Sequence, residues 1–258
     1  MKQSGSIAKR DERQKMNGQK ALKPIALIKT GTTIPQIKSR YGDFEDWFAE
    51  AMGVSDLLQI EVFKQHALPD AETLAGAVIT GSPAMVSSRE DWSEHTAEWL
   101  RQAVKTGLPI LGVCYGHQLL AHALGGRAGR NPAGRQIGTV KAQLIDSTTD
   151  DPLLGGLPRT FTAQTSHSEV VLELPLDAER LATSPLDDNF AIRFAENVWG
   201  VQFHPEFSKP VMSEYIRFRA EALSEEGLNP EQLLGNTTET KVAKSVLRRF
   251  ADMYGSNR

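Results

Sequence analysis

The sequence predicts an α/β fold with a doubly wound, mostly parallel sheet and a small antiparallel extension, and two observations predict it. In the first half of the chain, short apolar runs typical of buried strands alternate with stretches whose apolar residues recur at helical spacing. Such alternation is typical of parallel strands joined by right-handed helical crossovers. From Gly138 to Glu206 the pattern changes to short strands in succession, which indicates an antiparallel or mixed extension.

The first half predicts four strands and three helices. Asp43 can cap the first helix, because aspartate accepts hydrogen bonds from the free N–H groups at a helix start. Gly107 closes the second helix, as glycine often does. The predicted strands are residues 24–29, 57–63, 76–80 and 108–114, and the predicted helices are residues 43–52, 94–104 and 115–124.

The second half predicts five strands and two helices. The strands are residues 138–145, 160–163, 170–174, 191–194 and 199–203, and the helices are residues 211–223 and 239–253, with a linker-like segment at 227–238. The chain therefore divides into a polar tail (1–22), a main domain (23–225), and a linker with a C-terminal helix (226–258). The tail lacks hydrophobic periodicity, which predicts disorder. A transit peptide is the alternative, but Asp11 and Glu12 argue against it.

Composition narrows the class of protein. The 258 residues carry 29 basic and 32 acidic side chains and a net charge of −3, so we expect no nucleic-acid surface. A single cysteine excludes an internal disulfide and fits a reducing compartment. No apolar run approaches a membrane span, and no phosphate-binding loop or metal-ligand cluster stands out. The sequence predicts a cytoplasmic protein without a membrane anchor, metal or cofactor.

The only cysteine, Cys114, lies in the segment Pro-Ile-Leu-Gly-Val-Cys-Tyr-Gly-His-Gln at residues 109–118. It ends an apolar strand, precedes an amphipathic helix, and has Gly112 and Gly116 on either side. This layout suits a sharp strand-to-helix turn that exposes a nucleophile, and a helix N-terminus favours the thiolate. A lone buried cysteine is otherwise more often an inert core residue.

A second stretch, Val-Trp-Gly-Val-Gln-Phe-His-Pro-Glu at residues 198–206, supplies the groups that a thiol nucleophile requires. Pro205 restricts the residue before it to extended geometry, so we expect His204 at a strand end. A thiol needs a base to take its proton, and the base needs a partner that orients it. Cys114, His204 and Glu206 therefore form a candidate catalytic triad.

Together, Gly-Val-Cys-Tyr-Gly-His-Gln and Gly-Val-Gln-Phe-His-Pro-Glu resemble the motifs of the class I (triad-type) glutamine amidotransferases, which have a flavodoxin-like fold. The resemblance covers residues 24–215 and is strongest to the amidotransferase domain of GMP synthetase and its free-standing relatives. It implies that Cys114 is the nucleophile, that His204 acts as general base and then acid, and that Glu206 orients the imidazole.

The resemblance also implies an oxyanion hole made of backbone N–H groups. One natural donor is Tyr115, directly after the nucleophile. The second lies in the loop at Gly81 and Ser82, where related domains often have two glycines. An ordinary strand-to-loop turn is the alternative for this loop.

Four further residues are implied in substrate binding. Gln118 lies one helical turn after Cys114, so it can contact the α-amino acid end of the substrate. Ser166, His167 and Ser168 lie in a segment that resembles Ser-His-Gly-Asp and can hold the substrate through main-chain groups. His167 is also the alternative base, whereas His117 is interpreted as structural.

These residues predict hydrolysis of the γ-carboxamide of glutamine to glutamate and ammonia through a γ-glutamyl thioester. The ammonia would pass to a synthetase. We expect the synthetase to be a separate partner, because the chain has no room for a synthetase domain after the amidotransferase region. One alternative is a γ-glutamyl peptidase acting on γ-glutamyl peptides or conjugates. Another is a non-catalytic binding or regulatory protein on the same fold, whose signature would be loss of Cys114, His204 or Glu206; all three are present.

Overall fold

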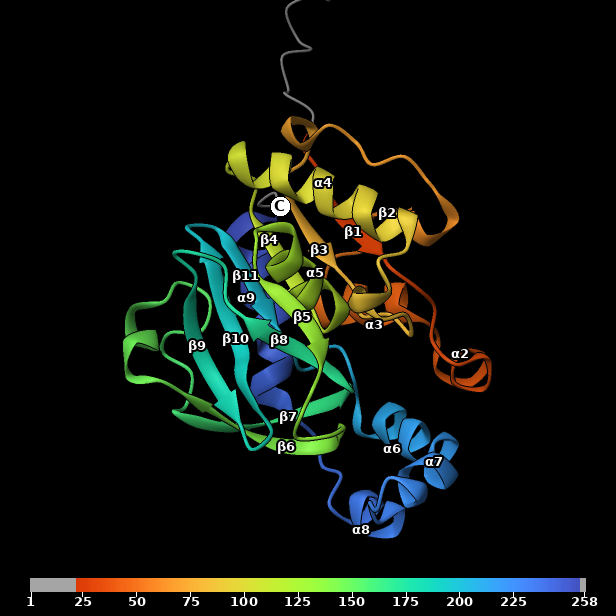
Figure 1. Ribbon diagram of the computed structural model, residues 1–258. Coiled ribbons are helices and arrows are strands. Elements are labelled where there is room, and N and C mark those ends of the chain that lie inside the picture. Colours follow the sequence, from red (N-terminus) through yellow and green to blue (C-terminus); the bar gives the residue numbers. More distant parts are fainter. Residues whose placement is uncertain (1–21, 256–258) are drawn as a thin grey trace, which may run out of the picture.

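The computed structural model describes residues 22–255 (Figure 1). The predicted polar tail therefore lies outside the described residues, apart from Leu22. Within the described part, every helix is too short or too polar to cross a bilayer.

One nine-stranded sheet runs through the molecule in the order β2-β1-β3-β4-β11-β10-β9-β6-β7. Its first five strands pair in parallel: β2 (Leu58–Glu61), β1 (Ile25–Lys29), β3 (Gly76–Ile79), β4 (Ile110–Val113) and β11 (Val198–Val201). The next four pair antiparallel: β10 (Asp187–Ala195), β9 (Glu179–Ser184), β6 (Gln136–Leu144) and β7 (Thr160–His167). The predicted α/β class is confirmed. The antiparallel extension continues the parallel sheet through β11 instead of forming a sheet of its own.

Helices cover both faces of the parallel half (Figure 1). The helices α4 (Asp91–Lys105) and α5 (Tyr115–Ala123) pack on one face, and α3 (Phe44–Met52) and α9 (Lys241–Tyr254) on the other. The strand β1 shows why two cores form. Its Ile25 and Leu27 side chains join the core beneath α3 and α9, while Ala26 and Ile28 join the core beneath α4 and α5, because successive side chains of a strand point to opposite faces.

Several elements differ from the sequence prediction. The helix expected at 211–223 breaks at Arg219 into α6 (Lys209–Phe218) and α7 (Ala220–Glu225). The segment 227–238, predicted as a linker, contains α8 (Pro230–Gly235), which Asn229 caps by accepting a hydrogen bond from Gln232 N–H. The strand expected at 57–63 is shorter, because a 3₁₀ turn follows it, and the strand expected at 160–163 runs on as β7.

Other elements were not predicted at all. They are α2 (Pro35–Tyr41), the strand β9, and β5 (Arg127–Arg130), which pairs with β8 (Glu169–Glu173) in a separate two-stranded sheet. Four 3₁₀ turns complete the secondary structure: η1 (Val62–Lys64), η2 (Ala71–Thr73), η3 (Val86–Ser88) and η4 (Asp146–Asp150).

The helix α5 lies unusually close to the strands beneath it. A Cβ atom added to Gly112 on β4 would lie 2.5 Å from the carbonyl carbon and oxygen of Gly116, and one added to Gly116 would lie 2.6 Å from Ile79 O on β3. Both contacts are with backbone atoms, which cannot move aside as a flexible side chain can. The two glycines therefore set the depth at which the helix begins, directly after Cys114.

We expect Gly112→Ala to lower the free energy of unfolding by about 2–3 kcal/mol, because overpacking a tight contact forces backbone shifts. Gly235→Ala is the matched control. Its Cβ would meet nothing within 4 Å, so its unfolding energy should change by less than about 1 kcal/mol. Urea denaturation of the two variants measures both values, and equal stabilities would contradict the close packing.

Candidate active site

Cys114 lies at the sharp turn between β4 and α5. Its backbone has φ 51° and ψ −99°, a region that residues other than glycine rarely adopt and that stores strain at functional sites. Two hydrogen bonds hold the turn: Cys114 N–H donates to Val201 O at 2.8 Å, and Cys114 O accepts from Gln118 N–H at 3.1 Å. The side chain is buried, with 6% of its surface exposed.

His204 reaches Cys114 because of how the strands pair. The strands β4 and β11 are parallel, with Val113 opposite Val201, so the residues that follow them emerge at the same edge of the sheet. His204 N–H donates to Gln164 O at 2.8 Å, which fixes the backbone after β11. The imidazole lies close enough to the Cys114 side chain for the two groups to interact electrostatically.

The imidazole is also held on its other sides. Nδ1 lies 2.7 Å from Glu206 Oε1, and the ring stacks on Phe207 with 4.1 Å between centroids. A Cβ atom on Gly81 would lie 2.7 Å from His204 Cε1 and 3.7 Å from Cys114 Cβ. Gly81 therefore leaves room for the ring against the thiol. The predicted triad residues come together as a chain of contacts from thiol to imidazole to carboxylate.

Charge decides the protonation of His204. Burial by itself lowers the pKa of an imidazole, but the negative charges of Glu206 and Cys114 and the hydrogen bonds to both outweigh it. The pKa of His204 is raised from 6.5 to about 10. The arrangement can therefore hold an imidazolium between Cys114 and Glu206 at neutral pH.

The loop after β3 is fixed by hydroxyl groups. The Gly81 carbonyl accepts hydrogen bonds from the Thr30 and Thr80 hydroxyls, each at 2.9 Å. The Ser82 hydroxyl donates to Thr30 O at 2.7 Å and accepts from Ala84 N–H at 3.1 Å. Because the C=O and N–H of one peptide unit point in opposite directions, the Ser82 N–H is turned away from these threonines.

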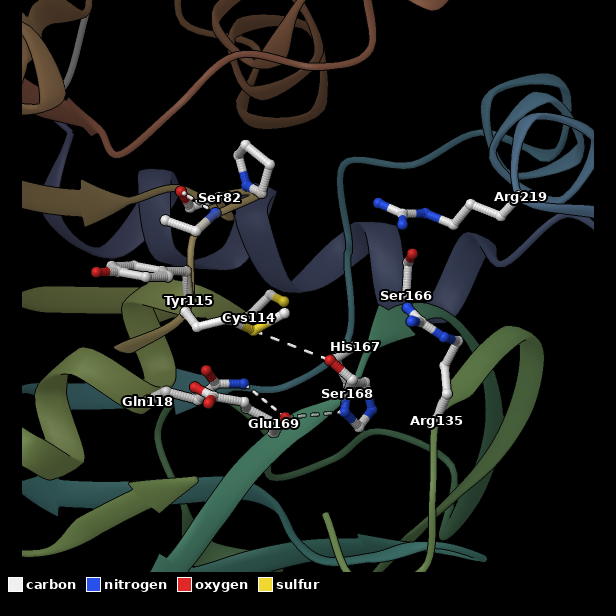
Figure 2. A pocket seen from close by; sticks show the side chains of 13 residues that line it. Ser82, Cys114, Tyr115, Gln118, Arg135, Ser166, His167, Ser168, Glu169 and Arg219 are labelled. Atoms are coloured by element: carbon white, nitrogen blue, oxygen red, sulfur yellow. Dashed lines mark hydrogen bonds between the residues drawn. The ribbon is translucent and has the colours of Figure 1, made fainter. Parts of the chain in front are cut away.

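The residues predicted to bind substrate line one small hollow of about 100 Å³ together with Cys114 and Tyr115 (Figure 2). They are Gln118, Ser166, His167 and Ser168. Gln118 is oriented by its amide nitrogen, which donates to Glu169 O at 2.7 Å and Gln202 Oε1 at 3.1 Å. Its own carbonyl oxygen is an acceptor, which suits an α-ammonium group.

His167 differs from His204 although it lines the same hollow. Its Nδ1 lies 3.1 Å from Glu169 O and its Nε2 lies 3.3 Å from Gln136 Oε1. Burial lowers the pKa of His167 to about 3, so its ring is neutral. His117 is also fully buried with a pKa lowered to about 3, and it packs against Phe194.

Three charged residues also line the hollow, and the sequence singled out neither of the two arginines among them. Glu169 is held by hydrogen bonds from Ser87 N–H and hydroxyl. Arg135 forms two hydrogen bonds with Glu226, at 2.7 and 2.9 Å. The Arg219 side chain makes no hydrogen bond or ion pair within residues 22–255, and its Nε is buried. Figure 2 shows Arg135 and Arg219 reaching toward Ser166 from different elements. No motif signals either arginine, because only the fold brings them to the site.

Metal binding finds no support in the described part of the chain, where no group of three His, Cys, Asp or Glu side chains could hold an ion. The chemistry available at this site is that of the thiol, the imidazole, the carboxylate and backbone N–H groups.

Comparison with known proteins gives a consistent family. The model of the class-I glutamine amidotransferases matches residues 44–220. The glutamine-hydrolyzing GMP synthase of Aeropyrum pernix is 39% identical over 141 residues, which make up 55% of this chain and 25% of that protein. Gamma-glutamyl peptidase 5 of Arabidopsis thaliana is 28% identical over 204 residues, 75% of this chain and 80% of that protein. This chain therefore matches only about a quarter of the length of the GMP synthase.

A solved glutamine amidotransferase from Thermotoga maritima has a similar structure. Its TM-score is 0.71 at 23% sequence identity, and the match covers 91% of this chain and 99% of that one. The likeness confirms the fold.

We expect His204 to keep its proton through neutral pH and to lose it only as the pH rises toward about 10. Because the folded pKa lies above the unfolded value, protonated His204 stabilises the fold fully below pH 6.5, and this contribution is lost as the pH rises through about 10. NMR titration of ¹⁵N-labelled histidine measures the pKa directly.

Glu206→Gln removes the largest favourable charge, so it should move this titration to lower pH. His167, whose ring is neutral, gives an internal control in the same spectra. A His204 that titrates near its unfolded value in the wild-type protein would contradict the ion pair.

Proposed function

The chain belongs to the class-I glutamine amidotransferase family, which confirms the resemblance drawn from the two motifs, and on this premise we propose that it hydrolyses the γ-amide bond of glutamine or of a related γ-glutamyl compound. One observation carries the proposal. His204 lies between the Cys114 thiol and the Glu206 carboxylate, just after two adjacent parallel strands.

The proposed reaction begins with the thiolate of Cys114, whose proton rests on His204. The sulfur attacks the γ-carbonyl carbon, and the carbonyl oxygen becomes an oxyanion. His204 gives its proton to the leaving nitrogen, the C–N bond breaks, and a γ-glutamyl thioester remains on Cys114. A water molecule then attacks the thioester, His204 takes its proton, and glutamate is released. Glu206 holds the imidazole in the orientation that both steps need.

Two backbone N–H groups are proposed to stabilise the oxyanion. Tyr115 N–H opens α5 directly after the nucleophile, and Ser82 N–H is turned away from the threonine hydroxyls that hold the Gly81 carbonyl. Donors that are fixed before the substrate binds lower the barrier without reorganisation. Gln118, Ser166, His167 and Ser168 are proposed to hold the γ-glutamyl group, because they line the hollow with Cys114.

Two uses of this chemistry are supported by different relatives. The relative from Aeropyrum pernix is named a glutamine-hydrolyzing GMP synthase, which supports glutamine as substrate and a synthetase partner that takes up the ammonia. The relative from Arabidopsis thaliana is named a gamma-glutamyl peptidase and matches along most of its length, which supports γ-glutamyl peptides or conjugates. A thiol nucleophile must stay reduced, and this supports a cytoplasmic location.

Cys114→Ala should reduce hydrolysis at least about 1000-fold, because residues of a triad act as a unit. An electrophilic glutamine analogue should label the wild-type protein once, at its single cysteine. Mass spectrometry of the labelled protein and a coupled assay for glutamate measure the two effects. Turnover of more than a few per cent in the variant would sink the thioester mechanism.

His204→Ala tests the assignment of the base, and His167→Ala is its matched control. His204→Ala should cost about as much as Cys114→Ala, and Glu206→Gln should cost less because it only disturbs the imidazole. His167→Ala removes a buried ring of the same hollow whose hydrogen-bond partners are Glu169 O and Gln136 Oε1. If it proves as damaging as His204→Ala, the assignment of the base is wrong.

The isolated protein should hydrolyse at least one γ-glutamyl compound without a partner. The Gly81 carbonyl is already fixed by Thr30 and Thr80, and serine in place of glycine restricts the positive φ values that a flipping loop would use. Release of glutamate from glutamine and from a panel of γ-glutamyl dipeptides tests this.

A loop variant links this activity to the hydroxyl groups. Thr30→Val should lower kcat about tenfold by loosening the Gly81–Ser82 peptide, while Thr162→Val, an exposed position on β7, should leave it unchanged. Complete inactivity that a synthetase partner reverses would instead favour a gated enzyme.

A further inference from the structure

A second hollow, of about 390 Å³, adjoins the candidate active site. It lies between the segment Thr32–Pro35 and the helix α6, and it shares Ser82, Pro83, Ser166 and Arg219 with the small hollow. The two hollows therefore meet at Ser82 and Pro83, in the loop after β3 that begins at Gly81 and that we call the oxyanion loop. We call the larger one the leaving-group pocket, because His204, the proposed donor of a proton to the leaving amine, lines it.

The two reactive side chains divide between the hollows. Cys114 lines the small hollow and is absent from the lining of the large one, whereas His204 lines the large hollow and is absent from the lining of the small one. In the proposed reaction the sulfur bonds the acyl carbon, and His204 protonates the leaving nitrogen. The γ-glutamyl chain therefore belongs in the small hollow and the leaving amine in the large one.

The size and walls of the leaving-group pocket do not match ammonia. Ammonia is about as large as water, which takes up about 30 Å³ in the liquid, whereas drug-sized ligands occupy pockets of about 300–1,000 Å³. The walls are largely apolar and include Ile34, Pro35, Phe207 and Phe218. Phe218 is 58% exposed. An exposed aromatic ring in this wall would serve no purpose if ammonia were the only leaving group.

Arg219 supplies a cation at the rim shared by both hollows. Within residues 22–255 its side chain has no hydrogen-bond or ion-pair partner, and its Nε is buried. The nearby Glu226 is already occupied by Arg135. Burial, and then the charge of Arg135, lower the pKa of Arg219. A bound carboxylate would offset both effects, and guanidinium groups pair well with carboxylates.

We propose that the leaving-group pocket binds the amine half of a γ-glutamyl amino acid or peptide, with an apolar or aromatic side chain against Phe207 and Phe218 and its carboxylate on Arg219. This inference rests on the proposed function and narrows it: the preferred substrate is a γ-glutamyl amino acid or peptide of this kind, and glutamine is a poor one. Arg219 and Phe218 are then specificity-determining residues.

The test compares kcat/KM for four compounds: glutamine, γ-glutamylglycine, γ-glutamylphenylalanine and γ-glutamylphenylalaninamide, which lacks the carboxylate. The wild-type protein should prefer γ-glutamylphenylalanine over each of the others by at least about tenfold, since a charge-assisted hydrogen bond or a buried ring each supply that much. Phe218→Ala should lower the ratio of kcat/KM for γ-glutamylphenylalanine to kcat/KM for γ-glutamylglycine.

Arg219→Met keeps the length of the side chain and removes its charge. It should lower the ratio of kcat/KM for γ-glutamylphenylalanine to that for its amide at least about tenfold. Arg217→Met is the matched control, because Arg217 lies two residues earlier, near the end of α6, pairs with Glu214 and is exposed; it should leave this ratio unchanged. An equal loss on all four compounds with Arg219→Met would place the guanidinium on the γ-glutamyl side and overturn the inference. Faster turnover of glutamine by the wild-type protein would also overturn it.

A binding measurement separates this inference from the proposed function. If no γ-glutamyl compound is turned over, the proposed function fails, and the pocket is then tested by calorimetric titration of the Cys114→Ala variant. γ-Glutamylphenylalanine should bind that variant at least about tenfold more tightly than glutamine does, and Arg219→Met on the same background should remove most of the difference. Equal binding of the two compounds would overturn the inference.

Discussion

The parallel pairing of β4 with β11 is the constraint on which the candidate site depends. The pairing places Val113 opposite Val201, and Cys114 N–H closes it with a hydrogen bond to Val201 O. The thiol and the imidazole that follow these strands are distant in sequence but emerge side by side. A shift of register by one residue would turn every side chain of β11 to the opposite face, so the proximity of Cys114 to His204 and the packing of the core are specified by the same hydrogen bonds.

Three buried histidines show that burial keeps an imidazole neutral unless charge partners outweigh it. His117 and His167 are buried without a carboxylate partner, and the pKa of each is lowered to about 3. His204 is buried to a similar degree, yet its pKa is raised to about 10 by Glu206 and Cys114. In the segment His204-Pro205-Glu206, the glutamate is therefore the residue that distinguishes His204 from the other two histidines. Because a buried ion pair is costly when one partner is lost, thiol, imidazole and carboxylate act together.

The sequence predicted what local chemistry determines. The α/β class follows from apolar periodicity, and the turn at Cys114 follows from Gly112 and Gly116, which act within a few residues. The continuation of the sheet through β11, the break at Arg219 and the position of the two arginines depend on contacts between distant segments, and no spacing records them. Even α8, which carries a cap residue and a proline at its start, was masked by its polar, linker-like composition.

The oxyanion loop and the leaving-group pocket point to the same kind of enzyme. An amidotransferase that waits for a partner needs a mobile loop and a narrow exit for ammonia. Here two threonine hydroxyls hold the Gly81 carbonyl, and the side faced by His204 opens into about 390 Å³ of largely apolar space. A fixed loop makes activity independent of a partner, and a wide pocket with an unpaired arginine gives binding energy to a large amine. Both features favour an enzyme that acts alone on γ-glutamyl amino acids over one that serves a synthetase.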